Sequence, residues 1–412
     1  LGDKANAVRL TDMEANNRHK NWRIFGNAYL EIEPIKALVL KSSFGLNYSN
    51  GFNSTFVPKW QEGSRKVETN ELTVREDNSL QWVWANTINY AKDFGKHSIN
   101  ALIGMEAKKE NGEHVQGYGR GLIIEDLDYR YLDAVTDGKD VSNNSSSYAM
   151  VSYFGKVNYA YDEKYLVSGT LRRDASSRFG NGNNSAIFPS VSAGWRISRE
   201  NFMETTSNWL SDLKLRASWG INGNDMIDNS ATYSLYYVDM NTGSYNFSGD
   251  GKTLSPGVIK TMSGNNNLKW EQTEQFNIGI DAAFLDNRLG VTMDYFKKKT
   301  KDMLIQKPYI AAIGEGGYKW YNAASMDNNG VEATITWHDK INDFNYEVAF
   351  NVSYYHNEIT DLPEEVKYTW GGGDGISKTI IGQSYGSWMA YKTDGIFRTK
   401  EEVYEYLSKY DV

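Results

Sequence analysis

Residues 212–222 read Asp-Leu-Lys-Leu-Arg-Ala-Ser-Trp-Gly-Ile-Asn, and this stretch decides the fold class. Its odd-numbered positions are apolar, whereas its even-numbered positions are polar or glycine. A period of two is typical of a β-strand, because successive side chains point to opposite faces of the sheet. The tract has about the 9–11 residues that a tilted strand needs to cross a bilayer. It therefore predicts a membrane-crossing strand with Leu215 and Ala217 towards lipid and Arg216 and Ser218 towards the interior.

The same alternation recurs in other tracts. Apolar residues alternate with polar ones in 190–198, in 275–284 and in 346–354. The apolar positions are Val191, Ala193, Trp195 and Ile197, then Phe276, Ile278, Ile280, Ala282 and Phe284, then Tyr346, Val348, Phe350, Val352 and Tyr354. A soluble β-sandwich or propeller also alternates in this way. The lengths of the connections must separate the two architectures.

Short and long connections alternate along most of the chain. Short links fall near 31–36, 91–96, 161–164, 285–288 and 338–343, and long polar stretches fall near 50–70, 108–146, 223–270, 304–327 and 358–383. An up-and-down outer-membrane barrel has tight periplasmic turns and long extracellular loops, and a sandwich has no reason to sort its connections. The sequence therefore predicts an all-β, antiparallel transmembrane barrel with about fourteen strands within residues 1–398. Residues 399–412 are predicted to form a separate short helical or loop segment.

Composition agrees with a barrel and excludes several other classes. Hydrophobic residues make up 40% of the 412 residues, yet aromatics reach 14%, which fits a polar interior with aromatic rims. No run of 18 apolar residues is present, so no transmembrane helix is expected. The chain has no cysteine, which excludes disulfides and thiolate metal sites. A net charge of −8 without a dense basic stripe argues against nucleic-acid binding.

No motif in the sequence demands catalysis. The five histidines lie far apart and have no metal-ligand spacing. The glycine-rich stretches 117–121 and 371–378 lack the remaining features of nucleotide-binding loops. Pairs of carboxylates such as Asp126 and Asp128 have no site around them. The sequence therefore predicts no enzyme and no cofactor, with calcium binding in an acidic loop left open.

One basic cluster stands out, in the stretch "LRRDASSRFG", which contains Arg172, Arg173 and Arg178. In a barrel wall these residues are expected where a strand leaves the bilayer, facing the interior or the rim. Two interpretations follow. The favoured one is a set of rim salt bridges with Asp174 and neighbouring loops, and the other is a binding surface for a polar substrate.

The chain around this cluster resembles a known family. The stretch "YDEKYLVSGTLRRDASSRFGNGNNSAIFPSVSAGWRISRENFM" (161–203) is similar to the barrel of SusC/RagA-type TonB-dependent outer-membrane transporters. The resemblance continues through "LKLRASWGINGND" (213–225), residues 266–305, "NNGVEATITW" (328–337) and "GQSYGSWMAYKTDGIF" (382–397). It covers most of 148–400 in order. Residues 18–107 match only at the level of barrel strands.

The resemblance implies a barrel of about 22 strands around a plug, in the outer membrane of a Gram-negative bacterium. It also implies a TonB-contacting segment and a SusD-like surface lipoprotein as a lid. Such proteins import large polar nutrients, oligosaccharides above all and peptides in some members. The plug, the TonB-contacting segment and the last strands are expected outside this chain, which is predicted to be a fragment of the barrel. A passive porin and, less favoured, a soluble β-rich carbohydrate-binding protein remain as alternatives.

A lid above the loops gives a second set of candidate contact residues. These are aromatic residues of the predicted loops, which have faces suited to sugar rings or to a protein partner. They are Tyr309, Tyr318, Trp320, Tyr321, Tyr368 and Trp370. Packing within a loop or in the aromatic girdle is the favoured role for any single one.

Overall fold

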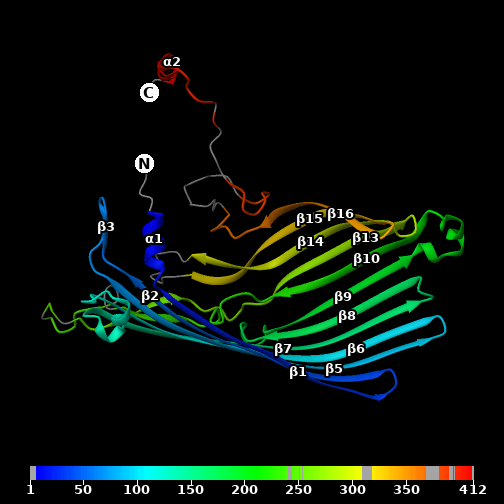
Figure 1. The fold of residues 1–412 in the computed structure, drawn as a ribbon, viewed down its shortest axis with the longest axis horizontal. Coiled ribbons are helices and arrows are strands. Elements are labelled where there is room, and N and C mark those ends of the chain that lie inside the picture. Colours follow the sequence, from blue (N-terminus) through cyan, green and yellow to red (C-terminus); the bar gives the residue numbers. More distant parts are fainter. Residues whose placement is uncertain are drawn as a thin grey trace.

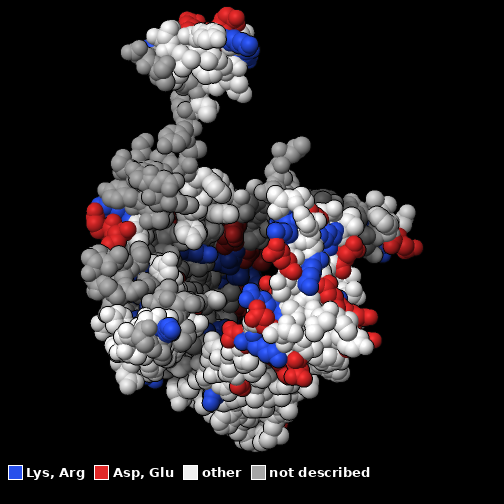
Figure 2. Space-filling model, turned by 90° about the vertical axis from the view of Figure 1, so that its left-hand side faces the viewer, with Lys and Arg blue, Asp and Glu red and all other residues white. Residues whose placement is uncertain are grey.

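The computed structural model describes residues 6–239, 244–249, 251–252, 254–308, 318–367, 380–388, 393 and 395–410. Its main element is one strongly curved 14-stranded sheet (Figure 1), and the space-filling view shows a hollow inside the curve (Figure 2). The strands of this sheet are β1 (Arg18–Ile35), β2 (Leu38–Val57), β5 (Glu71–Phe94), β6 (His97–Arg120), β7 (Asp137–Tyr161), β8 (Tyr165–Ser176), β9 (Ser185–Arg196), β10 (Leu210–Asn224), β11 (Leu235–Asp239), β12 (Gly257–Met262), β13 (Glu271–Phe284), β14 (Leu289–Pro308), β15 (Tyr318–Ile341) and β16 (Phe344–Asp361). The predicted all-β fold is confirmed.

Consecutive long strands pair antiparallel with each other, in the order β1-β2-β5-β6-β7-β8-β9-β10-β13-β14-β15-β16. The short pair β11 and β12 joins β15 through one parallel bridge, Met262 to Tyr318. A separate hairpin of β3 (Trp60–Glu62) and β4 (Arg65–Val67) lies between β2 and β5 along the chain. Within the described residues β1 pairs only with β2 and β16 only with β15, so this part of the sheet is open at both edges.

Tight turns gather at one end of the sheet, on the right in Figure 1. Left-handed backbone makes several of them, with φ of 52° at Asp162 and at Glu163 and 61° at Gly95. The long connections lie at the other end, as the sequence predicts. The predicted long loop over 108–146 is wrong in length. Strand β6 continues to Arg120 and β7 begins at Asp137, so the connection between them is only residues 121–136. These strand extensions are polar on both faces, so the sequence has no apolar period there although the backbone ladder continues.

The register places the apolar residues of neighbouring strands on one face. Leu215 lies opposite Trp195 and Ile280, and Ala217 lies opposite Ala193 and Ile278. Ile278 and Ile280 are 48% and 43% exposed. Arg216 and Ser218 lie on the other face, which lines the hollow where charged side chains gather in Figure 2. An exposed apolar face opposite a polar one suits a wall between lipid and water.

Aromatic residues border the apolar face at the end with the tight turns. Tyr161 stacks near Tyr165 at 6.4 Å between ring centroids, and Phe344 stacks near Tyr346 at 6.1 Å. Trp209 and Phe284 stack at 6.0 Å. Such rings are suited to the boundary between acyl chains and headgroups, where one side is apolar and the other wet.

Helices contribute little to the sheet. The described helices are α1 (Ala7–Glu14), α2 (Lys400–Tyr410) and the short 3₁₀ turns η1 (Leu127–Tyr129), η2 (Leu132–Ala134), η3 (Ile197–Arg199) and η4 (Asn201–Thr206). The Asn6 side chain caps α1 by accepting hydrogen bonds from the Val8 and Arg9 amides. None of the helices in the described residues is long and apolar enough to cross a bilayer. The helix α2 lies in the stretch that the sequence predicts as a helical or loop segment, and the division of the chain at residue 399 stays a prediction.

Candidate functional site

A row of hydroxyl and amide side chains crosses the face that lines the hollow. The register aligns these residues over six neighbouring strands, β6 to β10 and β13. They are Asn100, Asn158, Ser168, Ser192, Ser218 and Asn277. Together with Lys214 and Arg216 they line a groove of about 360 Å³. This surface offers hydrogen-bond donors and acceptors with two cations, so it suits polar groups from a ligand or another part of the protein.

An ion-pair network lies beside this groove. Arg216 on β10 lies 2.8 Å from Asp281 on β13 and 3.0 Å from Asp294 on β14. Lys214 is 3.5 Å from the same Asp281. Each of these side chains is a quarter to a third exposed. The network therefore holds its charges at a water-accessible surface and links three neighbouring strands.

Arg172 and Arg173, although adjacent in the sequence, point to opposite faces because they are neighbours on β8. On the hollow side, Arg172 lies 2.7 Å from Asp174 and 3.5 Å from Glu106, and it donates to Ser152 Oγ over 2.8 Å. On the apolar side, Arg173 donates to Ser185 Oγ over 3.0 Å.

Arg178 belongs to a third environment, a polar cluster just beyond the end of β8. This cluster, called the hub below, consists of Arg178, Asn229, Asp225 and Tyr148. The Arg178 Nε donates to Asn229 Oδ1 over 2.8 Å, and its guanidinium lies 3.5 Å from Asp225 and 4.1 Å from the centre of the Tyr148 ring. The Tyr148 hydroxyl also donates to Asp225, over 2.9 Å. The structure therefore does not bring the three arginines together. Contact between any of them and a substrate stays a prediction.

A hydrophobic cluster beside this hub packs the long connections together. Its buried members are Phe179, Phe188, Ile227, Ala231, Leu268 and Trp270. Trp320 packs against this cluster, and its indole N–H donates to Asp228 Oδ2 over 3.0 Å. Burial of Leu268 and Trp270, which are 0% and 4% exposed, fixes segments from distant parts of the sequence to one another.

The predicted aromatic contacts have different surroundings. Trp320 is partly buried against the hydrophobic cluster, and Tyr318 is 56% exposed. The Lys307 ammonium lies 4.7 Å from the centre of the Tyr321 ring. Tyr309, Tyr368 and Trp370 lie outside the described residues. Whether these aromatics contact a sugar, a peptide or a partner protein stays a prediction.

Sequence reasoning missed the acidic members of these networks. Asp281 lies on the polar face of the predicted strand 275–284, and Asp294 lies between the apolar residues Met293 and Tyr295. Opposite charges on the polar face were therefore a signal that could have found both carboxylates. Asp225 and Tyr148 lie 77 residues apart, and only the fold brings them together. Within the described ranges, no group of three or more His, Cys, Asp or Glu is arranged to hold a metal ion.

Charged residues also organise the end with the tight turns. Glu200 accepts hydrogen bonds from the Tyr165 hydroxyl over 2.7 Å, from the Trp195 indole over 3.0 Å and from Lys164 over 3.3 Å. The bonds from Tyr165 and Trp195 hold the pKa of Glu200 below its usual value. Lys96 binds Asp162 over 2.8 Å, and this hydrogen bond lowers the pKa of Asp162.

Comparison with known proteins identifies the architecture. Residues 3–395 match the model of the TonB-dependent receptor-like β-barrel family. The chain belongs to this family. The TonB-dependent receptor P3 of Formosa agariphila is 31% identical over 409 residues, which are 97% of this chain and 40% of that protein. The TonB-dependent receptor SusC of Bacteroides thetaiotaomicron is 31% identical over 346 residues, 83% of this chain and 33% of that protein.

A solved structure supports the same assignment. The RagAB peptide transporter matches with a TM-score of 0.77 and 28% identity, covering 92% of this chain and 41% of that chain. The predicted resemblance to SusC/RagA-type TonB-dependent receptors is therefore confirmed. This TonB-dependent receptor barrel segment spans between 33% and 41% of the length of these three relatives. Those relatives are named as receptors and transporters, and none of the three is named as an enzyme.

Proposed function

We propose that this chain is part of the wall of an outer-membrane transporter that imports a large polar nutrient in a TonB-dependent manner. The observation that carries the proposal is the two-sided wall. Its outer face is apolar and exposed, and its inner face has the polar row from Asn100 to Asn277 and the Arg216 network. Membership in the TonB-dependent receptor family supports this function over a soluble carbohydrate-binding protein.

Energy for import must come from a partner. A barrel of about 22 strands has a lumen wide enough to need a plug. The outer membrane has no ATP, so release of a substrate past a plug requires work delivered from the inner membrane. We therefore propose that the intact protein is coupled to TonB, through a segment outside this chain. A passive porin would need no such partner.

The second proposed partner is a SusD-like surface lipoprotein. Its expected contact region is the end of the wall with the long connections, where the hydrophobic cluster around Trp270 stabilises several of them. Exposed aromatics such as Tyr318 at this end have faces suited to a protein surface or to sugar rings. No catalytic step is part of this proposal.

The proposed substrate is an oligosaccharide, with a peptide as the second candidate. The polar row and the two cations of the lumen groove can hydrogen-bond to sugar hydroxyls or to peptide carbonyls. SusC and the RagAB peptide transporter are similar to this chain to nearly the same degree. The substrate class must therefore be measured.

Growth and uptake assays test the proposed function. Cells with the intact receptor, cells without it and cells without TonB would be supplied with defined oligosaccharide or peptide pools as the only carbon source. We expect uptake of one pool to require both the receptor and TonB, and a surface lipoprotein to co-purify with the receptor. Uptake that continues undiminished without TonB would favour the passive porin instead.

A further inference from the structure

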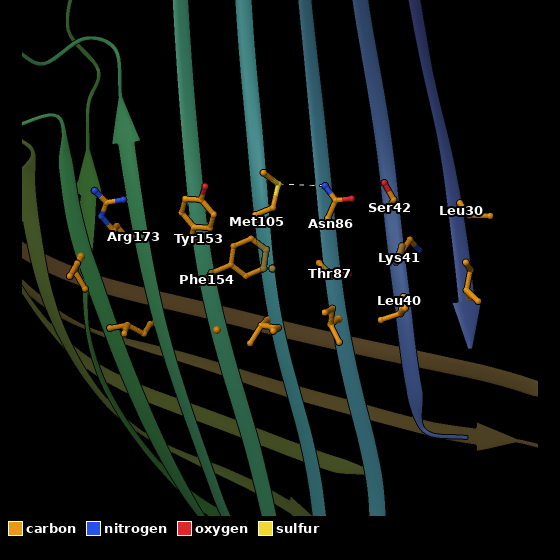
Figure 3. Close-up of a pocket in the computed structure, with 17 residues that line it drawn as sticks. Leu30, Leu40, Lys41, Ser42, Asn86, Thr87, Met105, Tyr153, Phe154 and Arg173 are labelled. Atoms are coloured by element: carbon orange, nitrogen blue, oxygen red, sulfur yellow. Dashed lines mark hydrogen bonds between the residues drawn. The ribbon is translucent and has the colours of Figure 1, made fainter. Parts of the chain in front are cut away.

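A second groove lies on the apolar face, away from the hollow. It has a volume of about 840 Å³ and crosses the strands from β1 to β9. Figure 3 shows this region of the wall, with the strands of the opposite side of the sheet behind it. Most of the side chains that line the groove share the face of Leu215 and Ala217 in the register. The groove is therefore separate from the proposed transport path.

The floor of this groove is apolar and has a gap at its centre. The register aligns its residues in one row across β2, β5, β6, β7 and β8, namely Leu40, Ile88, Ile103, Gly155 and Leu171. Gly155 has no side chain, and a Cβ there would lie 3.8 Å from Ile103, an ordinary contact distance. The missing side chain leaves a channel between Ile103 and Leu171 that suits a hydrocarbon chain.

A row of four polar side chains and Met105 borders this floor on the side of the long connections. Ser42, Asn86, Met105, Tyr153 and Arg173 lie side by side in Figure 3, as the register also places them. Arg173 is exposed, and the ion pairs in the described part of the chain include none that it makes. Arg172, on the other face, has two carboxylates within 3.5 Å. The next row of the same face, towards the long connections, is again apolar and includes Phe44, Trp84 and Val151. A cation without a carboxylate on such an apolar face is suited to an anionic headgroup.

We propose that this groove binds one phosphorylated membrane lipid. An acyl chain lies over Gly155 between Ile103 and Leu171, and the phosphate binds the Arg173 guanidinium. The ligand is a lipid rather than free phosphate because apolar side chains form most of the site. Arginine presents its N–H groups in a fork that matches phosphate oxygens, and Tyr153 beside it has an amphipathic ring suited to headgroup depth. The lipid lies in the leaflet on the side of the long connections.

Native mass spectrometry of the intact receptor, freed of lipid in a neutral detergent, tests this site. The probes are dioleoyl phosphatidic acid and dioleoylglycerol, which have the same acyl chains and differ by the phosphate. Wild-type receptor is compared with Arg173→Gln and with Gly155→Leu. The matched controls are Arg199→Gln, which removes an exposed cation near the tight turns, and Gly169→Leu, which adds the same side chain to the apolar face outside the groove. Heat-modifiable migration on gels verifies that each variant is folded.

We expect phosphatidic acid to bind wild-type receptor in a 1:1 complex and more tightly than dioleoylglycerol. Arg173→Gln should weaken phosphatidic acid about tenfold and leave dioleoylglycerol unchanged, as for the loss of a charge-assisted hydrogen bond. Gly155→Leu should weaken both lipids, and both controls should bind like wild type. Equal binding of the two lipids to wild type, or no effect of Arg173→Gln, would overturn the proposal.

Discussion

Arg216 and Asp294 form a 3.0 Å ion pair although β13 runs between their strands. Gly279 is the β13 residue between them, and it makes this contact possible. A Cβ at position 279 would lie 2.3 Å from Asp294 Oδ1 and 2.9 Å from Arg216. The absence of a side chain at one position therefore lets charges two strands apart stabilise the inner face.

Substitution of this glycine should uncouple the pair. We expect Gly279→Ala to displace the two flexible side chains and to reduce the free energy of unfolding by about 0.5–1 kcal/mol, as for a partly exposed ion pair. A double-mutant cycle between Arg216→Gln and Asp294→Asn, read by urea unfolding, should show coupling in the wild-type background and none in the Gly279→Ala background. Gly290→Ala is the matched control, because a Cβ there meets Thr336 at an ordinary 3.9 Å. Coupling that survives Gly279→Ala would contradict this account.

Removal of the hub arginine should loosen the long connections without opening the sheet. In Arg178→Gln the hub loses its ion pair with Asp225 and its stacking on Tyr148, and the Asp225 carboxylate is only 14% exposed. We expect a local cost of about 1–3 kcal/mol and faster proteolysis within residues 225–231. Arg199→Gln, whose partner Glu163 is 67% exposed, should leave this cleavage rate unchanged. Equal cleavage of the Arg178 variant and wild type would show that the hub does not hold these connections.

Substitutions of Trp320 and Tyr318 should have different effects, because the first residue packs within the long connections and the second is exposed. Trp320→Phe keeps a ring against the hydrophobic cluster but loses the N–H bond to Asp228, so it should increase proteolysis of the long connections. Tyr318→Ala removes an exposed side chain and should leave proteolysis unchanged while weakening co-purification of the surface lipoprotein. Unchanged co-purification in the Tyr318 variant would remove this residue from the proposed partner surface.

Glu200 should stabilise the folded protein at neutral pH and lose this effect as the pH falls. Because its folded pKa lies below the unfolded value, its stabilising contribution is complete above that unfolded value and is lost as the pH falls through the folded pKa. We expect Glu200→Gln to have a lower thermal midpoint than wild type at pH 7. The two midpoints should converge as the pH falls below the ordinary glutamate range. A difference that persists unchanged at low pH would exclude an ionised Glu200 as its source.

The sequence predicts the strands and their two faces well, but it predicts poorly the side-chain contacts between residues that lie far apart in the chain. Alternation assigns Leu215 and Arg216 to opposite faces because a strand has a period of two, and tight turns at positions such as Asp162 follow from short polar links. The hub could not be predicted, because Arg178, Asp225 and Tyr148 meet only after the hairpins have paired. The strand extension to Arg120 was missed because its residues are polar on both faces. Gly279 acts through a missing side chain, which no residue pattern marks.

The membrane-crossing wall is tested most directly by spin labels placed singly at residues 213 to 221 of the intact receptor in bilayers. Oxygen partitions into lipid, whereas a nickel chelate stays in water, so their relaxation effects report the surroundings of each label. We predict high oxygen access at 215, 217 and 219 and high nickel access at 216 and 218. Uniform nickel access along the whole tract would contradict the account.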